Sequence, residues 1–258
     1  MKGGRAVFRF YAELNDFLPA DRRFSDFSAD FAFGATVKDA IESLGVPHTE
    51  VDVILVNAES VGFSHRLKDG DRISVYPVFE SLDISSVTRL RPAPLRDTRF
   101  VVDANLGQLA RYLRLLGFDA EYSQEFSDSE LVKLSISEGR LLLSRDIGVL
   151  KHGALTHGYF VRAQDGKSQI VEVLSRFDLF SALAPLSRCA NCNGSLHSVD
   201  KEEIAHRLEP STREHFDRFW ACERCNKIYW RGAHIAGIEN LVREVEGAAA
   251  HRLDTGYL

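Results

Sequence analysis

The sequence contains four cysteines, and they form two Cys-x-x-Cys pairs in the last third of the chain. The pairs are Cys189 with Cys192 and Cys222 with Cys225. Two-residue spacing lets both thiolates of one pair reach the same tetrahedral ion, and four thiolates complete the coordination of a structural zinc. A module of about 50 residues can hardly build a sufficient hydrophobic core alone, so zinc binding would stabilise it. The spacing therefore predicts a zinc ribbon over residues 186–240.

The sequence carries no signal for secretion or for membrane spanning. Residues 1–14 contain no apolar signal-peptide core, and the chain contains no run of about 18 apolar residues. We therefore expect a cytoplasmic protein that does not contact a membrane. Cytosolic thiols stay reduced, so the cysteines are interpreted as metal ligands rather than disulfides. Two alternatives stay open: His234 as a replacement ligand, and redox chemistry at one of the pairs.

Composition and charge describe an ordinary globular protein. Of 258 residues, 45% are hydrophobic and 27% are charged, which excludes a disordered or fibrous chain. The formal net charge of -5 excludes a protein that coats nucleic acid nonspecifically, so any nucleic acid must bind locally. Pro92 and Pro94 mark an extended linker, and a second break falls at Pro185. The predicted domains are residues 1–85, 98–184 and 186–240.

The first predicted domain combines short apolar runs with one helical pattern. Strands are expected at residues 6–10, 53–56 and 72–76. Between them, Thr36 is the expected N-cap of a helix that stops at Gly45. This order and the segment LKDGDRISVYP resemble the ubiquitin-like β-grasp domains of small sulfur carriers, and the alternative is another small α+β module. Active carriers end in a free Gly-Gly tail, whereas this chain continues through residues 78–81, so the resemblance implies a docking role.

The second predicted domain alternates strand and helix patterns, which predicts an α/β fold with a parallel sheet covered by helices. The expected strands are residues 100–103, 119–122, 141–146 and 159–161. The expected helices are residues 105–117, 127–139 and 169–174. Two of the strands, near Asp103 and Asp146, end in an acidic residue. Side chains at the carboxyl ends of parallel strands converge on one crevice, so we expect these two carboxylates to lie close together.

Two neighbouring carboxylates repel each other unless a divalent cation or a shared proton lies between them. Oxygen ligands of this kind suit magnesium or manganese, and Asp128 or Glu130 at a helix start can add a further acid. A metal held in this way can activate water for attack on a phosphodiester, as in many nucleases. Each acid alone can also be explained as a helix cap or a strand end. Asp119 and Asp165 are interpreted as solvated loop acids.

Several basic residues close to these acids are candidates for contacts with a phosphate backbone. They are Arg111, Arg114, Arg145 and Lys151. Arg111 and Arg114 share the polar face of their helix, so an ordinary solvated face is the alternative. In the zinc ribbon, the Trp230 side chain can stack on a base beside Arg231, or it can belong to the small core of the ribbon.

Three separated segments carry a resemblance to one family: FVVDANLGQLARYLRLLGFDAEY, SDSELVKLSISEGRLLLSRD and FWACERCNKIYWRGAH. They are similar to the Mut-seven C-terminal RNase family, a PIN-like nuclease domain joined to a zinc ribbon, over about residues 98–238. Bacterial members often carry a ubiquitin-like domain in front. The resemblance implies a magnesium or manganese site at Asp103, at Asp128 or Glu130, and at Asp146. PIN-like sites usually have a fourth acid, which the matched segments do not place.

The residues and the resemblance together predict a cytoplasmic, metal-dependent ribonuclease with RNA as its substrate and a protein partner for the ubiquitin-like domain. The alternative is a noncatalytic RNA-binding or adaptor protein in which the acidic site has decayed and the zinc ribbon is structural. A third hypothesis is a sulfur-carrier-type partner protein built on the first domain. No sequence signal indicates an oligomeric state.

Overall fold

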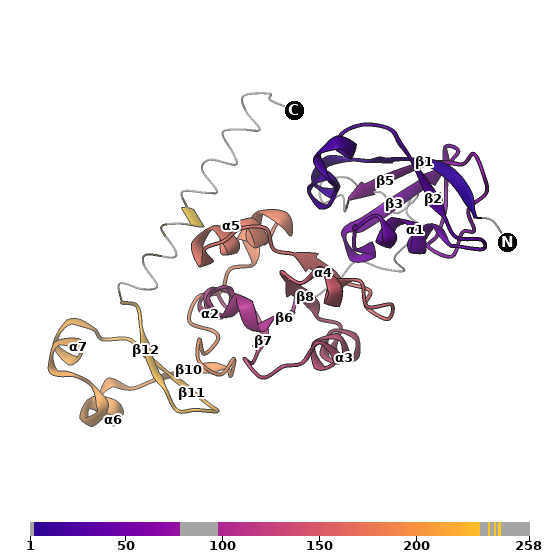
Figure 1. The fold of residues 1–258 in the computed structure, drawn as a ribbon. Helices are drawn as coiled ribbons and strands as arrows, with labels where there is room; N and C mark the ends of the chain where they lie inside the picture. The colour runs from indigo at the N-terminus through magenta and orange to yellow at the C-terminus, as the bar shows by residue number, and fades with distance from the viewer. Residues whose placement is uncertain (1–2, 78–97, 233–236, 238–239, 241, 244–258) are drawn as a thin grey trace. The chain divides into compact units, whose positions relative to one another are not determined.

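A computed structural model describes residues 3–77, 98–232, 237, 240 and 242–243 of the chain (Figure 1). The described residues fall into two compact units. The first unit contains residues 3–77 with 127–160, and the second contains residues 98–126 with the described residues from 161 onward. The expected linker at Pro92 and Pro94, residues 78–85 and the candidate ligand His234 lie outside the described residues. The predicted domain boundaries therefore stay predictions.

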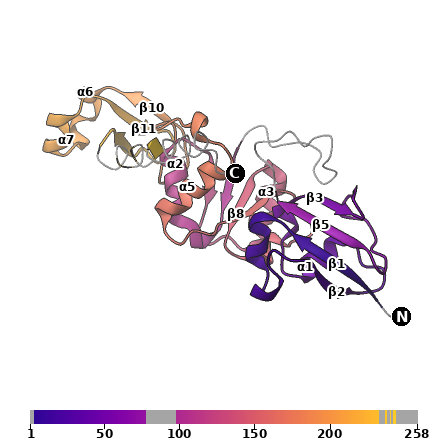
Figure 2. The same ribbon diagram turned by 90° about the horizontal axis from the view of Figure 1, so that it is seen from above.

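The N-terminal part of the first unit is a five-stranded sheet in the order β2-β1-β5-β3-β4. Its strands are β1 Gly4–Phe10, β2 Phe27–Phe31, β3 Val51–Val56, β4 Glu59–Ser60 and β5 Arg72–Pro77. β1 and β5 are parallel, and the other neighbouring strands are antiparallel. Helix α1 (Val37–Ser43) lies against one face of the sheet (Figures 1 and 2). Short 3₁₀ helices are η1 Ala12–Phe17, η2 Ala20–Arg22 and η3 His48–Glu50.

Local sequence explains this β-grasp sheet and its helix. Alternate residues of β1 are buried, including Phe8 and Phe10, and Ile41 of α1 packs in the same core. Thr36 begins the helix in a capping box with Asp39: the Asp39 amide donates to Thr36 Oγ1, and the Asp39 carboxylate accepts the Thr36 amide. The Thr36 hydroxyl, at 2.7 Å, and the Thr36 amide both donate to the Asp39 carboxylate, and these two bonds lower the pKa of Asp39. The expected N-cap of this helix is thus confirmed.

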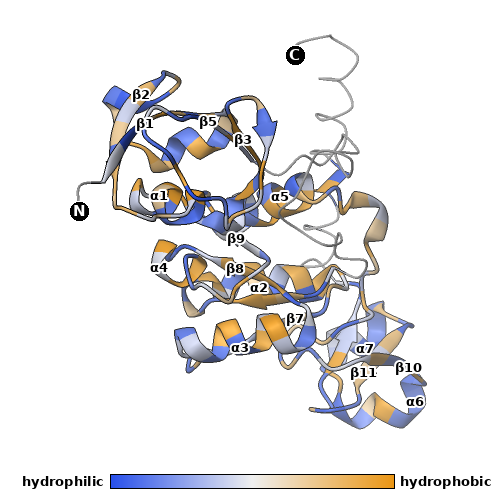
Figure 3. Ribbon diagram, turned by 90° about the vertical axis from the view of Figure 1, so that its right-hand side faces the viewer, coloured by the Kyte–Doolittle hydropathy of each residue, from blue (hydrophilic) through white to orange (hydrophobic). Residues whose placement is uncertain are grey.

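The first unit also contains elements of the second predicted domain. They are α3 Asp128–Glu138, β8 Leu141–Ser144, α4 Ile147–Leu150 and β9 Gly158–Phe160. β8 and β9 are parallel, with Leu142 opposite Gly158. Helix α3 carries both hydrophobic and hydrophilic stretches (Figure 3) and ends at Gly139, whose positive φ of 62° suits glycine.

The second unit contains the other elements of the α/β pattern. They are β6 Phe100–Val102, η4 Ala104–Leu106, α2 Gly107–Leu115, β7 Ala120–Tyr122, α5 Gly166–Arg176 and η5 Phe180–Ala182. β6 and β7 are parallel, and the order of the four-stranded sheet is β7-β6-β8-β9. α2 and α5 approach closely at Gly166, where a Cβ would lie 2.7 Å from Gln108 Oε1. The predicted α/β fold with a parallel sheet is confirmed.

The cysteine-containing segment of the second unit is a three-stranded antiparallel sheet with short helices. Its elements are β10 Leu196–Val199, α6 Lys201–Ile204, η6 Ala205–Arg207, α7 Pro210–His215, β11 Phe219–Cys222 and β12 Ile228–Trp230. The Trp230 ring lies 6.2 Å from the ring of Phe216 and 6.5 Å from that of Phe219. Trp230 therefore contributes to the small core of the ribbon. Among the described residues, no helix combines the length and apolar character that crossing a membrane requires.

Candidate functional site

The four cysteine sulfurs gather in one cluster, with all four within 4.8 Å of one another. The Sγ atoms of Cys189 and Cys225 are 3.5 Å apart, and those of Cys192 and Cys222 are 3.4 Å apart. A tetrahedral zinc with Zn–S bonds of about 2.3 Å spaces its sulfurs about 3.8 Å apart. The cluster is therefore compatible with a zinc ribbon, as the spacing of the pairs predicted.

Each cysteine pair sits on a turn of the same geometry. The amide of Asn193 donates to the carbonyl of Cys189 at 2.9 Å, and the amide of Asn226 donates to the carbonyl of Cys222 at 2.9 Å. Asn193 and Asn226 have positive φ angles of 63° and 58°, a conformation that asparagine tolerates better than most residues. The two turns thereby direct both pairs of sulfurs toward the same point.

The thiols of this cluster differ in how easily they ionise. Burial opposes ionisation of Cys189, but hydrogen bonds from the Tyr229 hydroxyl and from the Cys192 and Asn191 amides lower its pKa to about 6. Burial raises the pKa of Cys192 to about 12, and hydrogen bonds with the neighbouring thiols act in the same direction. Burial thus opposes ionisation of Cys192, and a divalent cation at the centre of the four sulfurs would favour its thiolate.

The first cysteine turn is joined to strand β7 by Asn193, whose side chain is 2% exposed. Its Nδ2 donates to Asp119 Oδ1 at 2.7 Å and to Glu121 Oε1 at 3.0 Å, and its Oδ1 accepts the Ala120 amide at 3.1 Å. Arg188 forms an ion pair with Asp119 at 3.4 Å. The expectation that Asp119 is a solvated loop acid was therefore wrong, because residues distant in sequence bind its carboxylate.

A second connection between the turn and the α/β elements is Arg114 of helix α2, which is 4% exposed. Its Nε donates to the Ala120 carbonyl at 2.8 Å, and its Nη1 donates to the Asn191 carbonyl at 3.1 Å. Burial lowers the pKa of Arg114, and the Glu121 carboxylate acts in the opposite direction. The alternative of an ordinary solvated face is therefore wrong for Arg114, because its guanidinium is buried and donates to backbone carbonyls, and its contact with RNA stays a prediction.

Replacing Asn193 by glycine is expected to destabilise the second unit by about 2–3 kcal/mol more than replacing Asn226 by glycine. Both positions have positive φ, so glycine adds no backbone strain at either one, and the extra freedom of the unfolded chain is common to both variants. Only Asn193→Gly removes the amide donor that Asn193 gives to the partly buried Asp119 and Glu121 carboxylates.

Urea unfolding followed by tryptophan fluorescence measures this difference, because both tryptophans of the chain, Trp220 and Trp230, lie in the ribbon. Asn226 is the matched control because it is exposed. Among the described residues, its side chain makes one hydrogen bond, which its Oδ1 accepts from Arg207 at 3.3 Å. Equal losses of stability in the two variants would contradict the role assigned to the Asn193 side chain.

The predicted acidic residues occupy the expected elements. Asp103 directly follows β6 and is 8% exposed. Asp146 caps the N-terminus of α4: its Oδ1 accepts the Gly148 amide at 2.6 Å, and its own amide donates to Ser144 Oγ at 2.8 Å. Asp103 belongs to the second unit and Asp146 to the first, so the convergence of the two carboxylates stays a prediction.

The two acids at the start of α3 differ in what they bind. Glu130 Oε2 accepts from the Ser127 amide at 2.9 Å and from Ser127 Oγ at 2.7 Å, which closes a capping box and lowers the pKa of Glu130. Asp128 is the first residue of the helix and is exposed. Asp165, expected to be a solvated loop acid, is exposed but caps α5 by accepting the Lys167 and Ser168 amides.

The remaining basic candidates are placed differently from one another. Arg111 is exposed on α2, and Arg145 is half-buried beside Asp146. The Lys151 ammonium donates to the carbonyl of Glu42 at 2.7 Å, so it is engaged within the chain. Contacts of these residues with RNA stay predictions.

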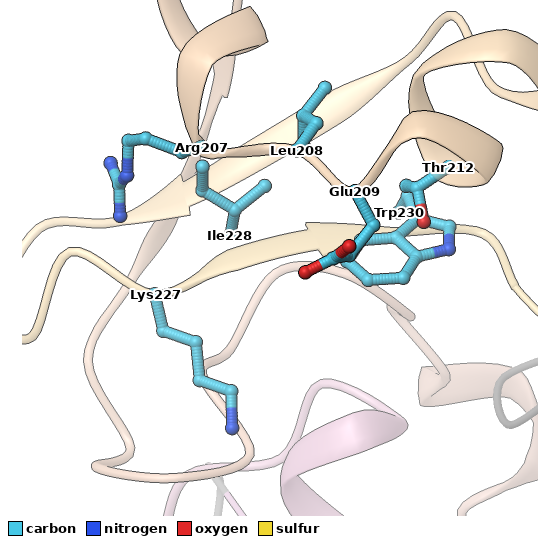
Figure 4. Close-up of a pocket in the computed structure, with 7 residues that line it drawn as sticks. All are labelled: Arg207, Leu208, Glu209, Thr212, Lys227, Ile228 and Trp230. Atoms are coloured by element: carbon cyan, nitrogen blue, oxygen red, sulfur yellow. The ribbon is translucent and has the colours of Figure 1, made fainter.

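The ribbon carries a groove of about 260 Å³ that the sequence did not indicate. Arg207 and Lys227 lie toward one end, and Trp230 and Thr212 lie toward the other (Figure 4). These residues come from two short stretches, 207–212 and 227–230, which only the folded ribbon brings together. Arg207 also donates to the side-chain oxygen of Asn226, which ties this groove to the second cysteine turn.

The fold and the cysteine cluster define an α/β protein with an N-terminal β-grasp sheet, parallel strands flanked by helices, and a four-cysteine ribbon. The model of the Mut7-C RNAse domain matches residues 98–242, more than half of the chain, and the chain belongs to this family. The model of the Mut7-C ubiquitin domain matches residues 4–83. The family resemblance of the sequence segments is confirmed.

Solved structures also resemble the chain over part of its length. The small archaeal modifier protein 1 of H. volcanii is 21% identical, with 30% of this chain and 100% of that chain covered and a TM-score of 0.25. A putative molybdopterin converting factor, subunit 1, from Pyrococcus furiosus is 23% identical, with 30% and 99% covered and a TM-score of 0.24. No curated protein matches the chain.

Proposed function

We propose that this protein is a metal-dependent ribonuclease. The match to the Mut7-C RNAse domain supports a nuclease-type function, and it is the observation that carries the proposal. Within the matched region, Asp103 follows β6 and Asp146 follows β8, which are the strand ends where parallel sheets place their active residues. RNA is the substrate class that fits this family.

The proposed catalytic metal is magnesium or manganese, because carboxylate oxygens are the donors that these ions prefer. Asp103 and Asp146 would hold it, with Asp128 as the third ligand, since Glu130 is engaged in the capping box of α3. When bound, such an ion activates water and stabilises the charge that develops on a phosphodiester. The Gly148 amide donates to Asp146 Oδ1, and the other oxygen, Oδ2, would be the one that binds the cation.

The four cysteines would hold a structural zinc that takes no part in the chemistry, because four thiolates leave no open position for substrate. Through Asn193 and Arg114, the first cysteine turn is bound to β7 and α2. Zinc would thus stabilise elements of the RNAse domain as well as the ribbon. Thiolate ligands persist where thiols stay reduced, which supports a cytoplasmic location.

Contacts with the phosphate backbone would come from Arg111 and Arg145, with Lys227 of the ribbon groove as a further cation. A noncatalytic RNA-binding adaptor is the second candidate. Two of the proposed acids favour it because each already has a structural role: Asp146 is the N-cap of α4, and Glu130 forms the capping box of α3 with Ser127. The docking role of the ubiquitin-like domain is compatible with either candidate.

The test is a cleavage assay on end-labelled single-stranded and double-stranded RNA with purified full-length protein. We expect cleavage in manganese or magnesium that excess EDTA abolishes and that added manganese restores. A gel-shift assay with the same RNAs runs alongside. Binding of RNA with no cleavage in either metal would reject the nuclease and favour the adaptor.

A further inference from the structure

Strand β9 stands last in the order β7-β6-β8-β9, so one of its edges has no neighbouring strand in that sheet. The Leu142 amide donates to the His157 carbonyl at 3.2 Å. Bonding residues alternate along a parallel ladder, so the amide of Phe160 points away from β8. A buried or half-buried edge amide requires another partner.

Glu50 of η3 is that partner. Its Oε1 accepts the Phe160 amide at 2.6 Å, and the Glu50 side chain is 1% exposed. Hydrogen bonds to a charged acceptor are among the strongest in proteins, and a buried carboxylate is costly without them. Phe17, the last residue of η1, adds an edge-to-face contact: the centroid of its ring lies 5.4 Å from that of the Phe160 ring.

His48, two residues before Glu50, contacts the loop between α4 and β9. Its Nε2 lies 2.7 Å from the Leu155 carbonyl, and because a carbonyl only accepts, this nitrogen carries the hydrogen. Its Nδ1 lies 2.6 Å from Glu42 Oε1 of α1, and the ring is 5% exposed. The imidazole is therefore held between the β-grasp helix and the α4–β9 loop.

Lys151 is the C-cap of α4, and its side chain contacts helix α1 of the β-grasp sheet. Its ammonium donates to the Glu42 carbonyl at 2.7 Å, in the last turn of α1, where the helix dipole favours a cation. Lys38 makes a longer contact of the same kind with the Gly153 carbonyl at 3.3 Å. Contacts from α1 and η3 thus run along the chain from residue 151 to residue 160.

We propose that residues 42–50 form a docking face for the chain's own α4 and β9, and that this face positions Asp146. Helix α4 has only four residues, with Asp146 as its N-cap and Lys151 as its C-cap, so holding one end also holds the other. The effect on the metal ligand rests on the proposed nuclease function, whereas the docking does not. The ubiquitin-like domain then acts within its own chain, with Glu50, His48 and Lys151 as positioning residues.

Hydrogen exchange of the Phe160 amide in the full-length protein tests the docking without any need for catalysis. Glu50→Ala is expected to speed this exchange about tenfold or more, whereas Glu50→Gln keeps an acceptor and stays within about threefold of the wild type. Asp30→Ala, which removes an exposed carboxylate from β2 of the same sheet, is the matched control and leaves the rate unchanged. The β5 amides of Ile73 and Val75 must stay protected, which shows that the β-grasp core remains folded.

The effect on the metal site is measured with Lys151→Met, which removes a half-buried hydrogen bond between α4 and α1 without removing a core residue. The manganese concentration for half-maximal cleavage is expected to rise about tenfold at an unchanged KM for RNA.

Unchanged Phe160 exchange in Glu50→Ala would overturn the docking, whether or not the protein cleaves RNA. A raised KM in Lys151→Met with an unchanged manganese requirement would overturn the positioning role and assign Lys151 to RNA. Faster exchange in a protein that cleaves no RNA would support the docking and reject only the nuclease.

Discussion

Asp103→Asn and Asp146→Asn are each expected to lower manganese-dependent RNA cleavage by about a hundredfold or more. Asparagine preserves the size of the side chain and can still cap a helix, so the change removes mainly the negative charge that would hold the metal. For Asp146, the carboxamide oxygen can still accept the Gly148 amide, which keeps the start of α4 in place. The loss should therefore appear in kcat and in the manganese requirement, while the thermal unfolding midpoint changes little.

Asp165→Asn is the matched control for Asp146→Asn. Asp165 also caps a helix through its side chain, which accepts the Lys167 and Ser168 amides at the start of α5, but it has no place in the proposed metal site. We expect its cleavage rate to stay within about twofold of the wild type. Asp128→Asn compared with Glu130→Gln then shows which residue is the third ligand. Wild-type rates in both Asp103→Asn and Asp146→Asn would reject the carboxylate site.

Cys189→Ser and Cys222→Ser are expected to abolish zinc retention and to unfold the ribbon. Structural zinc sites contribute about 10–16 kcal/mol of apparent binding free energy near neutral pH, which exceeds what a small three-stranded sheet can supply. Because Asn193 and Arg114 bind the first cysteine turn to β7, the unfolding should spread and expose the Ala120 amide. Elemental analysis measures zinc, and tryptophan fluorescence with hydrogen exchange of β7 measures the unfolding.

The same site predicts how zinc binding depends on pH. Zinc binds thiolates, so protons compete with it and its affinity falls as the pH is lowered. Hydrogen bonds lower the pKa of Cys189, so this thiol ionises more readily, whereas burial raises the pKa of Cys192, so this thiol must release its proton when zinc binds. Competition with a chelator at pH 6, 7 and 8 should show rising affinity and proton release. Zinc affinity that is independent of pH would contradict the thiolate site. So would a folded ribbon in Cys189→Ser or Cys222→Ser with no zinc bound.

The features that the sequence predicted well depend on residues close together in the chain. Two-residue spacing brings the sulfurs of each pair to one side of a turn, and Thr36 begins a helix because its cap partner is three residues away. The order of strands and helices likewise predicted the α/β fold, since short crossover units favour parallel pairing. Family membership followed from the same local segments.

The spacing of Arg114 placed it on the polar side of its helix, and only the folded chain brings the Ala120 and Asn191 carbonyls to its guanidinium. Asp119 is another such case, because its partners Arg188 and Asn193 lie far along the chain. The spacing of polar and apolar residues along the chain does not predict such contacts, because they depend on how separate elements pack against one another.

By itself the sequence determined the pairing of the four cysteines that cluster in the fold, the Thr36 helix cap, the α/β class and the family, because each depends on spacing or on a local pattern. Only the tertiary structure decided that Asn193 and Arg114 join the first cysteine turn to β7, and that Glu50 accepts the Phe160 amide at the edge of β9. The physical reason is that a buried polar group takes whichever partner the fold brings within hydrogen-bond distance, however far away that partner lies in the chain.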